Sequence, residues 1–137
     1  MENALDGRAV APGFIDVHTH DDSVLLSPNG MEPKISQGVT RVIAGNCGIS
    51  LVPLRMTATP PPPFTLIGNR EAFAFDSFAD YITALGTRGI ATSAALLPGH
   101  TTLRQRHVAD TQRPANEAEL SRMLANLEQP SPKELSG

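Results

Sequence analysis

Two histidines, His18 and His20, stand one residue apart at the end of an apolar run in the segment FIDVHTHDD. Side chains at positions i and i+2 of a strand point to the same side, so both imidazoles can reach one metal ion while Thr19 turns aside. Neutral imidazole is a good ligand for zinc and related ions. A histidine pair at a strand end can equally be solvated or hydrogen-bonded to a loop. The spacing alone leaves both interpretations open.

The single cysteine of the chain, Cys47, lies in the Gly-rich segment GNCGIS. One cysteine excludes an internal disulfide and fits a reducing cytosol, so we expect a cytoplasmic protein. A thiolate is a strong zinc ligand. The same residue can also be a nucleophile or an inert small apolar side chain. Because two histidines end the neighbouring predicted strand, we favour a metal ligand.

Four further polar residues come after predicted strands and are weaker candidates. Asp21 and Asp22 can orient a ligating imidazole or bind a cation, although solvated loop acids are the simpler interpretation. His100 and Arg104 in GHTTLR can bind a substrate carboxylate, although a structural role is the alternative. We treat His107 as a surface residue.

The elements that must position these residues can be read from the hydrophobic pattern. Apolar, β-branched runs predict strands over 14–18, 39–45 and 90–97. Helical spacing and capping signals predict helices over 31–37, 76–85 and 116–127, the second with Asp76 as N-cap and the last with a capping box from Asn116 to Glu119. Residues 52–70 contain Pro60–Pro63 and predict a long, extended surface excursion. GHTTLR is predicted to be a loop.

This order of elements predicts an α/β fold with a parallel sheet buried under helices. His18 and His20, Cys47, and His100 each come after one of the three predicted strands. The carboxyl ends of parallel strands meet at one edge of a sheet, which is where sites assemble in such folds. The positions of these residues are therefore the strongest structural argument for function in the sequence.

The length, the charge and the hydropathy of the chain argue against several other classes of protein. The chain has 137 residues, enough for one modest domain, and a net charge of −3 with scattered basic residues, so we expect no nucleic-acid partner. No apolar run approaches the ~20 residues of a membrane span. The N-terminal segment MENALDGR has no signal-peptide pattern, and we expect no secretion.

Several motifs, taken in their order along the chain, resemble those of a known protein family. GRAVAPGFIDVHTHDD resembles the segment leading into the first barrel strand of the amidohydrolase superfamily, and PKISQGVTRVIAGNCGISLVPL is similar to its N-acyl-D-amino-acid deacylase (D-aminoacylase) family. DSFADYITAL and GHTTLR fit the same family. The resemblance implies a zinc-dependent hydrolase on a TIM barrel beside a small β-sandwich domain, with His18, His20 and Cys47 in the metal centre. It implies hydrolysis of an N-acyl-D-amino acid to a carboxylate and a free D-amino acid.

The family's remaining zinc histidines and its general-base aspartate come from later strands, and no histidine lies beyond His107 here. A TIM barrel needs eight strands and ~250 residues. We therefore expect a fragment: residues 1–13 as a remnant of the small domain and lead-in, 14–128 as the first three βα units of a partial (β/α)8 barrel, and 129–137 as a disordered tail. The catalytic set is incomplete, so the isolated chain is expected to be inactive. The alternative is a non-catalytic remnant or interaction module with at most a weak partial metal site, and exposed strand edges predict self-association.

Overall fold

The computed structural model describes residues 10–128 and the backbone of 134–135. Strands β1 (Phe14–Thr19), β2 (Val39–Ala44) and β5 (Ser93–Leu96) form a parallel sheet in that order, and β6 (Glu134–Leu135) joins β5 antiparallel. The three predicted parallel strands are confirmed, although β5 is shorter than the predicted 90–97. The chain is a mixed α/β structure.

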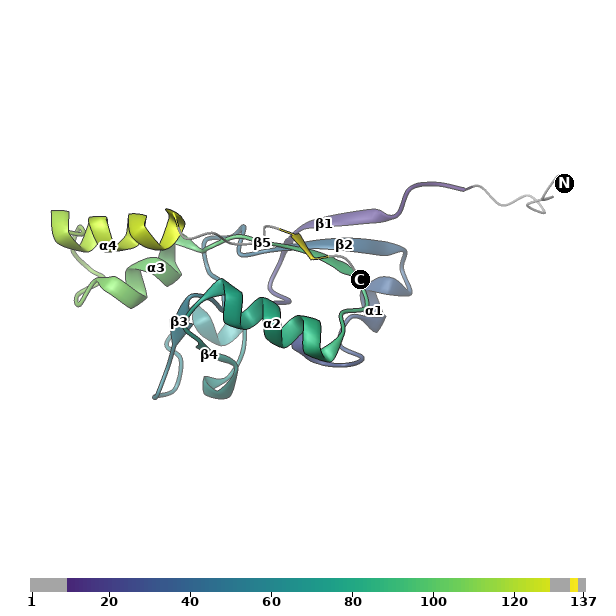
Figure 1. Ribbon diagram of the computed structural model, residues 1–137, viewed down its shortest axis with the longest axis horizontal. Coiled ribbons are helices and arrows are strands. Elements are labelled where there is room, and N and C mark those ends of the chain that lie inside the picture. The colour runs from purple at the N-terminus through teal and green to yellow at the C-terminus, as the bar shows by residue number, and fades with distance from the viewer. Residues whose placement is uncertain (1–9, 129–133, 136–137) are drawn as a thin grey trace, which may run out of the picture.

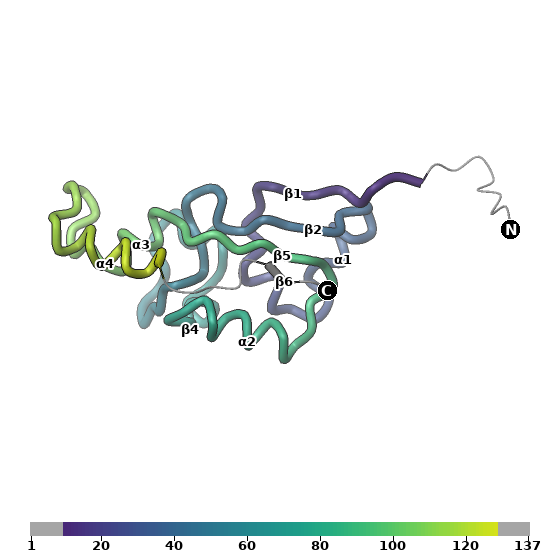
Figure 2. The backbone as a smooth tube through the Cα atoms, turned by 45° about the horizontal axis from the view of Figure 1, so that its top comes forward, coloured from purple at the N-terminus to yellow at the C-terminus, as the bar shows by residue number. Residues whose placement is uncertain are grey.

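The helices lie on one side of the sheet and beyond one of its ends. Helix α2 (Phe78–Arg88) and the short β3 (Leu54–Arg55) and β4 (Ala74–Phe75) pair lie below the sheet in Figure 1, while α3 (His100–His107) and α4 (Glu117–Glu128) lie beyond the end toward which β1, β2 and β5 run. Figure 2 shows the same arrangement from a second direction. The carboxyl ends of the strands therefore face the α3–α4 pair.

The first strand is the exposed edge of this sheet. Phe14, Ile15 and Val17 are more than half exposed, at 67%, 56% and 55%. In β2, by contrast, Val42 and Ala44 are buried completely or almost so. The prediction that all three apolar runs are buried strands is wrong for β1. In the described part of the chain it is an edge strand, and no described helix packs extensively over its side chains.

The two helices predicted before β5 form with shifted limits. Helix α1 (Glu32–Ile35) is a single turn with Pro33 in its first turn. Helix α2 runs from Phe78 to Arg88 instead of the predicted 76–85. Its N-cap is Ser77 rather than Asp76, and the Ser77 hydroxyl accepts a hydrogen bond from the Asp80 N–H at 3.2 Å. Its buried residues, Phe78, Tyr81 and Leu85, belong to the main hydrophobic core.

The segment between β2 and α2 is not the extended surface excursion predicted from its prolines. It folds into the β3–β4 pair and two short 3-10 helices, η2 (Phe64–Leu66) and η3 (Arg70–Ala72), and joins η1 (Val24–Leu26) around the core. Its apolar side chains supply a large part of that core: Leu54, Phe64, Ile67 and Phe73. Phe64 and Phe73 meet edge to face with ring centroids 5.8 Å apart.

The GHTTLR segment is helical, not the predicted loop. It opens α3, in which Thr102 and Leu103 are buried and Leu103 packs with Val108 and Met123 in a small second core. The predicted last helix is confirmed as α4, with the Asn116–Glu119 capping box formed by two hydrogen bonds of 2.9 Å each.

Most of the predicted terminal regions lie outside the described residues. Residues 1–9 of the predicted lead-in and 129–133 and 136–137 of the predicted tail are among these, and the predicted division into lead-in, barrel and tail stays a prediction. Strand β6 falls inside the predicted tail, where the sequence carries no strand signal. None of the helices in the described ranges has the length and apolar character of a membrane span.

Candidate metal centre

The register of the sheet brings the three predicted donor residues together. Thr19 pairs with Ala44, so His20, just beyond β1, is level with the turn that begins at Gly45, just beyond β2. His18, His20 and Cys47 form one group, in which all the ligating atoms lie within 4.8 Å of one another. We call these three residues the donor cluster. His18 is exposed, and His20 and Cys47 are half-buried.

The distances inside the donor cluster suit a shared ion. The Cys47 Sγ atom lies 3.5 Å from His20 Nδ1. Zinc–sulfur and zinc–nitrogen bonds of ~2.3 and ~2.0 Å at a tetrahedral angle put the two ligand atoms about 3.5 Å apart. Two imidazoles and a thiol are also the donor types that zinc prefers. The three residues therefore fit a zinc ion by donor chemistry, and the distance between Cys47 Sγ and His20 Nδ1 fits two ligands of one ion.

The loop that carries Cys47 is fixed by the turn before it and by α3. Gly45 has φ of +85°, and a Cβ atom there would lie 1.9 Å from the Leu97 carbonyl oxygen, so only glycine fits. A Cβ on Gly99 would come within 2.6 Å of the Gly48 carbonyl oxygen, which shows how closely the start of α3 approaches the loop. The backbone N–H of Thr101 donates to that same oxygen at 2.8 Å.

Buried hydroxyl groups complete this attachment. The Ser50 N–H donates to Thr102 Oγ1 at 2.8 Å, and the Thr102 hydroxyl donates back to the Ser50 carbonyl at 2.9 Å. The Gly99 N–H donates to Ser50 Oγ at 2.9 Å. Sequence reasoning missed Ser50 and Thr102, because a predicted loop at GHTTLR gave no reason to pair them.

Asn46 links the cysteine loop directly to the histidine strand. Its Nδ2 donates to the backbone carbonyl of Val17 at 2.7 Å. Asn46 is the neighbour of Cys47, and Val17 is the neighbour of His18, so this bond joins the two segments that carry donors. Its place between the glycine turn and the cysteine was the only signal in the sequence that could have found it.

Asp22, just beyond the end of β1, is buried and bonded to two core residues. Its side chain is buried, Oδ1 accepts the Leu51 N–H at 2.9 Å, and its backbone carbonyl accepts the Tyr81 hydroxyl at 2.5 Å. Burial raises the pKa of Asp22 to about 6, and the bond from Leu51 opposes part of that rise. Burial also raises the pKa of the Tyr81 hydroxyl, which stays a neutral donor. The second oxygen, Oδ2, has no hydrogen-bond partner.

Asp21 and Asp16 face a lysine that the sequence pattern did not reveal. Lys34 Nζ forms ion pairs with both carboxylates, at 2.6 Å to Asp16 Oδ2. The hydrogen bond from Lys34 is the main reason that the pKa of Asp16 lies below its usual value. Burial alone would lower the pKa of Lys34, but its hydrogen bonds with Asp16 and Asp21 outweigh burial and raise it. Lys34 lies at the start of the family-like segment PKISQGVT, but no spacing rule links it to Asp16 and Asp21, which lie 18 and 13 positions earlier.

The two predicted substrate-binding residues lie on α3 and not in the donor cluster. His100 is the exposed first residue of the helix. The Arg104 guanidinium donates to the carbonyls of Thr111 and Arg113 at 2.9 and 2.7 Å, which gives it a structural role in the following loop. A role in substrate binding stays a prediction for both. His107 is half-buried and bonds Asn126 Oδ1 at 2.5 Å, so the surface assignment is wrong.

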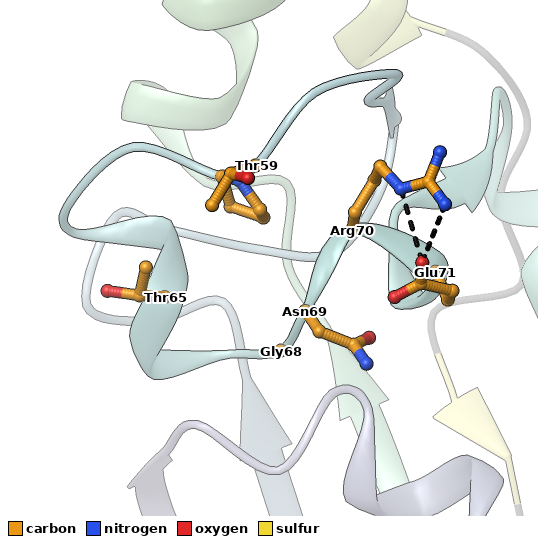
Figure 3. A pocket seen from close by; sticks show the side chains of 7 residues that line it. Thr59, Thr65, Gly68, Asn69, Arg70 and Glu71 are labelled. Carbon is orange, nitrogen blue, oxygen red and sulfur yellow. Dashed lines mark hydrogen bonds and ion pairs between the residues drawn. The ribbon is translucent and has the colours of Figure 1, made fainter.

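A hollow in the surface lies away from the donor cluster. An open pocket of about 560 Å³ is lined by residues of the segment between β2 and α2, including Thr59, Thr65 and Asn69 (Figure 3). Its one cation, Arg70, is bound through Nε and Nη2 to Glu71 at 3.1 and 2.8 Å. No donor-cluster residue lines this pocket.

Comparison with known proteins decides the family. Residues 3–132 match the model of the amidohydrolase family. The chain belongs to the amidohydrolase family. It is 50% identical to the D-aminoacylase of Alcaligenes xylosoxydans over 119 residues, and 49% identical to the N-acyl-D-aspartate deacylase of the same organism over 123 residues. The resemblance to N-acyl-D-amino-acid deacylases is thereby confirmed.

The match covers most of this amidohydrolase chain but a small part of its relatives. The match to D-aminoacylase covers 87% of this chain, the match to N-acyl-D-aspartate deacylase covers 90%, and each covers 24% of the relative. The chain therefore spans about a quarter of the length of the curated proteins it matches.

Solved structures agree with this chain in fold, and two of those described below concern a metal. A crystal structure of D-aminoacylase superposes with a TM-score of 0.79 at 49% identity, covering 84% of this chain and 24% of that one. Another D-aminoacylase structure, with a TM-score of 0.77 at 48% identity, concerns a binuclear metal centre in which one metal activates and the second attenuates. The N-acyl-D-glutamate deacylase of Bordetella bronchiseptica, with a TM-score of 0.75 at 36% identity, is complexed with zinc and a phosphonate inhibitor. This amidohydrolase chain thus has metal-dependent homologues.

Proposed function

We propose that this chain supplies part of the barrel and part of the zinc centre of an amidohydrolase that hydrolyses N-acyl-D-amino acids to a carboxylate and a free D-amino acid. The donor cluster is the observation that carries the proposal. Two imidazoles and a thiol from two segments of the chain converge at the carboxyl ends of parallel strands, which is where sites assemble in such folds.

The donor residues have distinct tasks in this proposal. His18 and His20 offer neutral imidazoles, and Cys47 offers a thiolate, whose charge favours a cation. Zinc, when bound, polarises the amide carbonyl and lowers the pKa of water. Asn46 and the Ser50–Thr102 pair keep the cysteine loop against β1 and α3, so the donors are held before a metal arrives.

We assign no general base among the described residues. Asp22 is buried and holds the Leu51 N–H, and Asp16 and Asp21 are paired with Lys34. We propose that residues 14–128 are the first three βα units of a (β/α)8 barrel, so a general base and further ligands would come from the βα units that this segment does not contain. Turnover would then need those units, and the isolated chain would release no D-amino acid even with added zinc.

A non-catalytic interaction module is the second candidate. The exposed apolar side chains of the edge strand β1 favour it, since such an edge can pair with another chain. The two candidates differ in whether the donor cluster supports chemistry once the rest of a barrel is supplied.

A chimaera tests this difference. Residues 10–128 would replace the matching segment of the Alcaligenes D-aminoacylase, and release of D-methionine from N-acetyl-D-methionine would be followed with and without zinc. We expect zinc-dependent turnover that Cys47→Ala abolishes, while the isolated chain stays inactive. A folded chimaera without activity would favour the non-catalytic module, and turnover that survives Cys47→Ala would remove the proposed metal role.

A further inference from the structure

One ammonium group contacts three residues that alternate with the histidines of the donor cluster. Lys34 Nζ meets Asp16 Oδ2 at 2.6 Å and Thr19 Oγ1 at 2.5 Å, and it also pairs with Asp21 Oδ2. In sequence, Asp16 precedes His18, Thr19 separates the two histidines, and Asp21 comes directly after His20. We call Lys34 and these three acceptors the lysine clasp.

The hydrogen bonds of the lysine clasp are complete. An ammonium group has three donors, and each finds one acceptor here. The Thr19 hydroxyl accepts from Lys34 and donates to Asp21 Oδ2 at 2.5 Å, so the acceptors are also joined to one another. Thr19 is buried, while Lys34 and its two carboxylates are only partly exposed. Such a closed network fixes the backbone that carries its members more strongly than separate surface pairs do.

The strand needs this support at the same place. Pairing between β1 and β2 is irregular from Asp16 to Thr19, so the segment around His18 lacks a regular ladder. Within the described part of the chain, β1 has no neighbour on its other side. Asp16 adds a local bond, because its Oδ1 accepts the His18 N–H at 3.2 Å, and Asp16 is itself held by Lys34.

We propose that Lys34 is a positioning residue of the metal centre, which holds the two imidazoles in the spacing that a shared ion requires. The inference rests on the proposed function of the donor cluster as a metal site. Lys34 touches no donor atom and acts through Asp16, Thr19 and Asp21. Residues that orient ligands from outside the coordination shell change metal affinity by roughly 10–100-fold when removed.

The direction in which the metal affinity changes distinguishes a positioning role of Lys34 from a purely electrostatic role. A lysine near a cation repels it, so a purely electrostatic role predicts that Lys34→Met binds metal as tightly as the unaltered chain or more tightly. A positioning role predicts weaker binding by about tenfold or more. Thr19→Val removes the shared hydroxyl with no change in charge and little change in size, and the positioning role predicts the same direction.

Cobalt titration of the whole chain measures this. Co²⁺ bound to a thiolate gives a near-ultraviolet charge-transfer band, which reports on Cys47 directly, and far-ultraviolet circular dichroism checks that each variant is folded. Arg55→Met is the matched control, because it removes the cation of another ion pair, Arg55–Asp76, at 2.8 Å.

We expect the band in the unaltered chain and in Arg55→Met, with a dissociation constant about tenfold or more higher in Lys34→Met and Thr19→Val. Equal or tighter binding by the two clasp variants would overturn the role of Lys34 and leave the metal site standing. If Lys34→Met does not fold, Thr19→Val alone decides. Absence of the band from the unaltered chain would overturn both the metal site and this inference.

Discussion

At the scale of single residues, neighbours of the donors make the bonds that fix them. Asn46 bonds the strand of His18, Thr19 joins the lysine clasp, and Ser50 ties the cysteine loop to α3. The donors themselves make few bonds: Cys47 contacts His20 and donates weakly to the Ile49 carbonyl at 3.7 Å. Ligating atoms that few protein groups occupy are available to an ion.

Glu119 gives the clearest pH-dependent prediction. The Glu119 side chain is buried and forms a bidentate ion pair with the Arg113 guanidinium. This pair, together with a hydrogen bond from the Asn116 N–H, holds the pKa of Glu119 at about 2, below its ordinary value of 4.5. Because the pKa is lower in the folded chain, the stabilisation is fully present above pH 4.5 and is lost as the pH falls toward 2.

Glu119→Gln should therefore lower the free energy of unfolding at pH 6 and lose its effect as the pH approaches the pKa of Glu119. Urea unfolding across this range, followed by circular dichroism, measures it. The control is Glu117→Gln, an exposed position in the same first turn, which should behave like the unaltered chain. Parallel pH profiles for Glu119→Gln and the unaltered chain would show that the pair with Arg113 is not formed.

The sequence predicts the donors better than their supports, for a physical reason. His18, His20 and Cys47 lie at or just beyond the ends of predicted strands, and strand ends can be read from short apolar runs. Lys34 and Thr102 depend on which helix turn packs beside which loop, and no local pattern contains that information. His107 was misjudged for the same reason, because its partner Asn126 lies on a separate helix.

At the scale of elements, the turn from β2 into the cysteine loop is the most constrained point. Gly45→Ala would force an alanine to φ of +85° and push its Cβ against the Leu97 carbonyl. We expect the variant to lose about 1–3 kcal/mol of stability or more, as measured by thermal or urea unfolding.

Gly86 is the matched control for this prediction. It lies inside α2, and nothing is found within 4 Å of the position its Cβ would take. Gly86→Ala should therefore stabilise the chain by about 0.5–1 kcal/mol through helix propensity. Equal effects at the two glycines would contradict the close approach of Gly45 to the Leu97 carbonyl.

Two elements show why the sequence pattern was misleading. GHTTLRQRH has too few apolar residues to indicate a helix, yet α3 forms because Leu103 packs on Met123 of α4, a contact across the sequence. The Pro-rich segment 52–70 suggests solvent-exposed chain, yet Leu54, Phe64 and Ile67 are inside the core. Tertiary packing overrode local propensity in both cases.

At the scale of the whole molecule, the open edge of the sheet is the feature that most favours association between chains. Phe14, Ile15 and Val17 are exposed on a strand that can still accept a partner strand. We expect the isolated chain to associate as its concentration rises, which sedimentation velocity measures.

Ile15→Lys should reduce this association, because a charge on an edge strand opposes pairing. Leu66→Lys is the control, since Leu66 is 63% exposed in η2 and not in the sheet. A monomeric unaltered chain, or equal effects of the two lysines, would contradict association through β1.

The most direct test of the donor cluster is X-ray absorption at the zinc edge of the zinc-loaded chain, with Cys47→Ser as the control. We predict one sulfur at ~2.3 Å and imidazole nitrogens at ~2.0 Å in the unaltered chain, and loss of the sulfur shell in Cys47→Ser. A first shell of oxygen and nitrogen alone in the unaltered chain would contradict a zinc centre built from His18, His20 and Cys47.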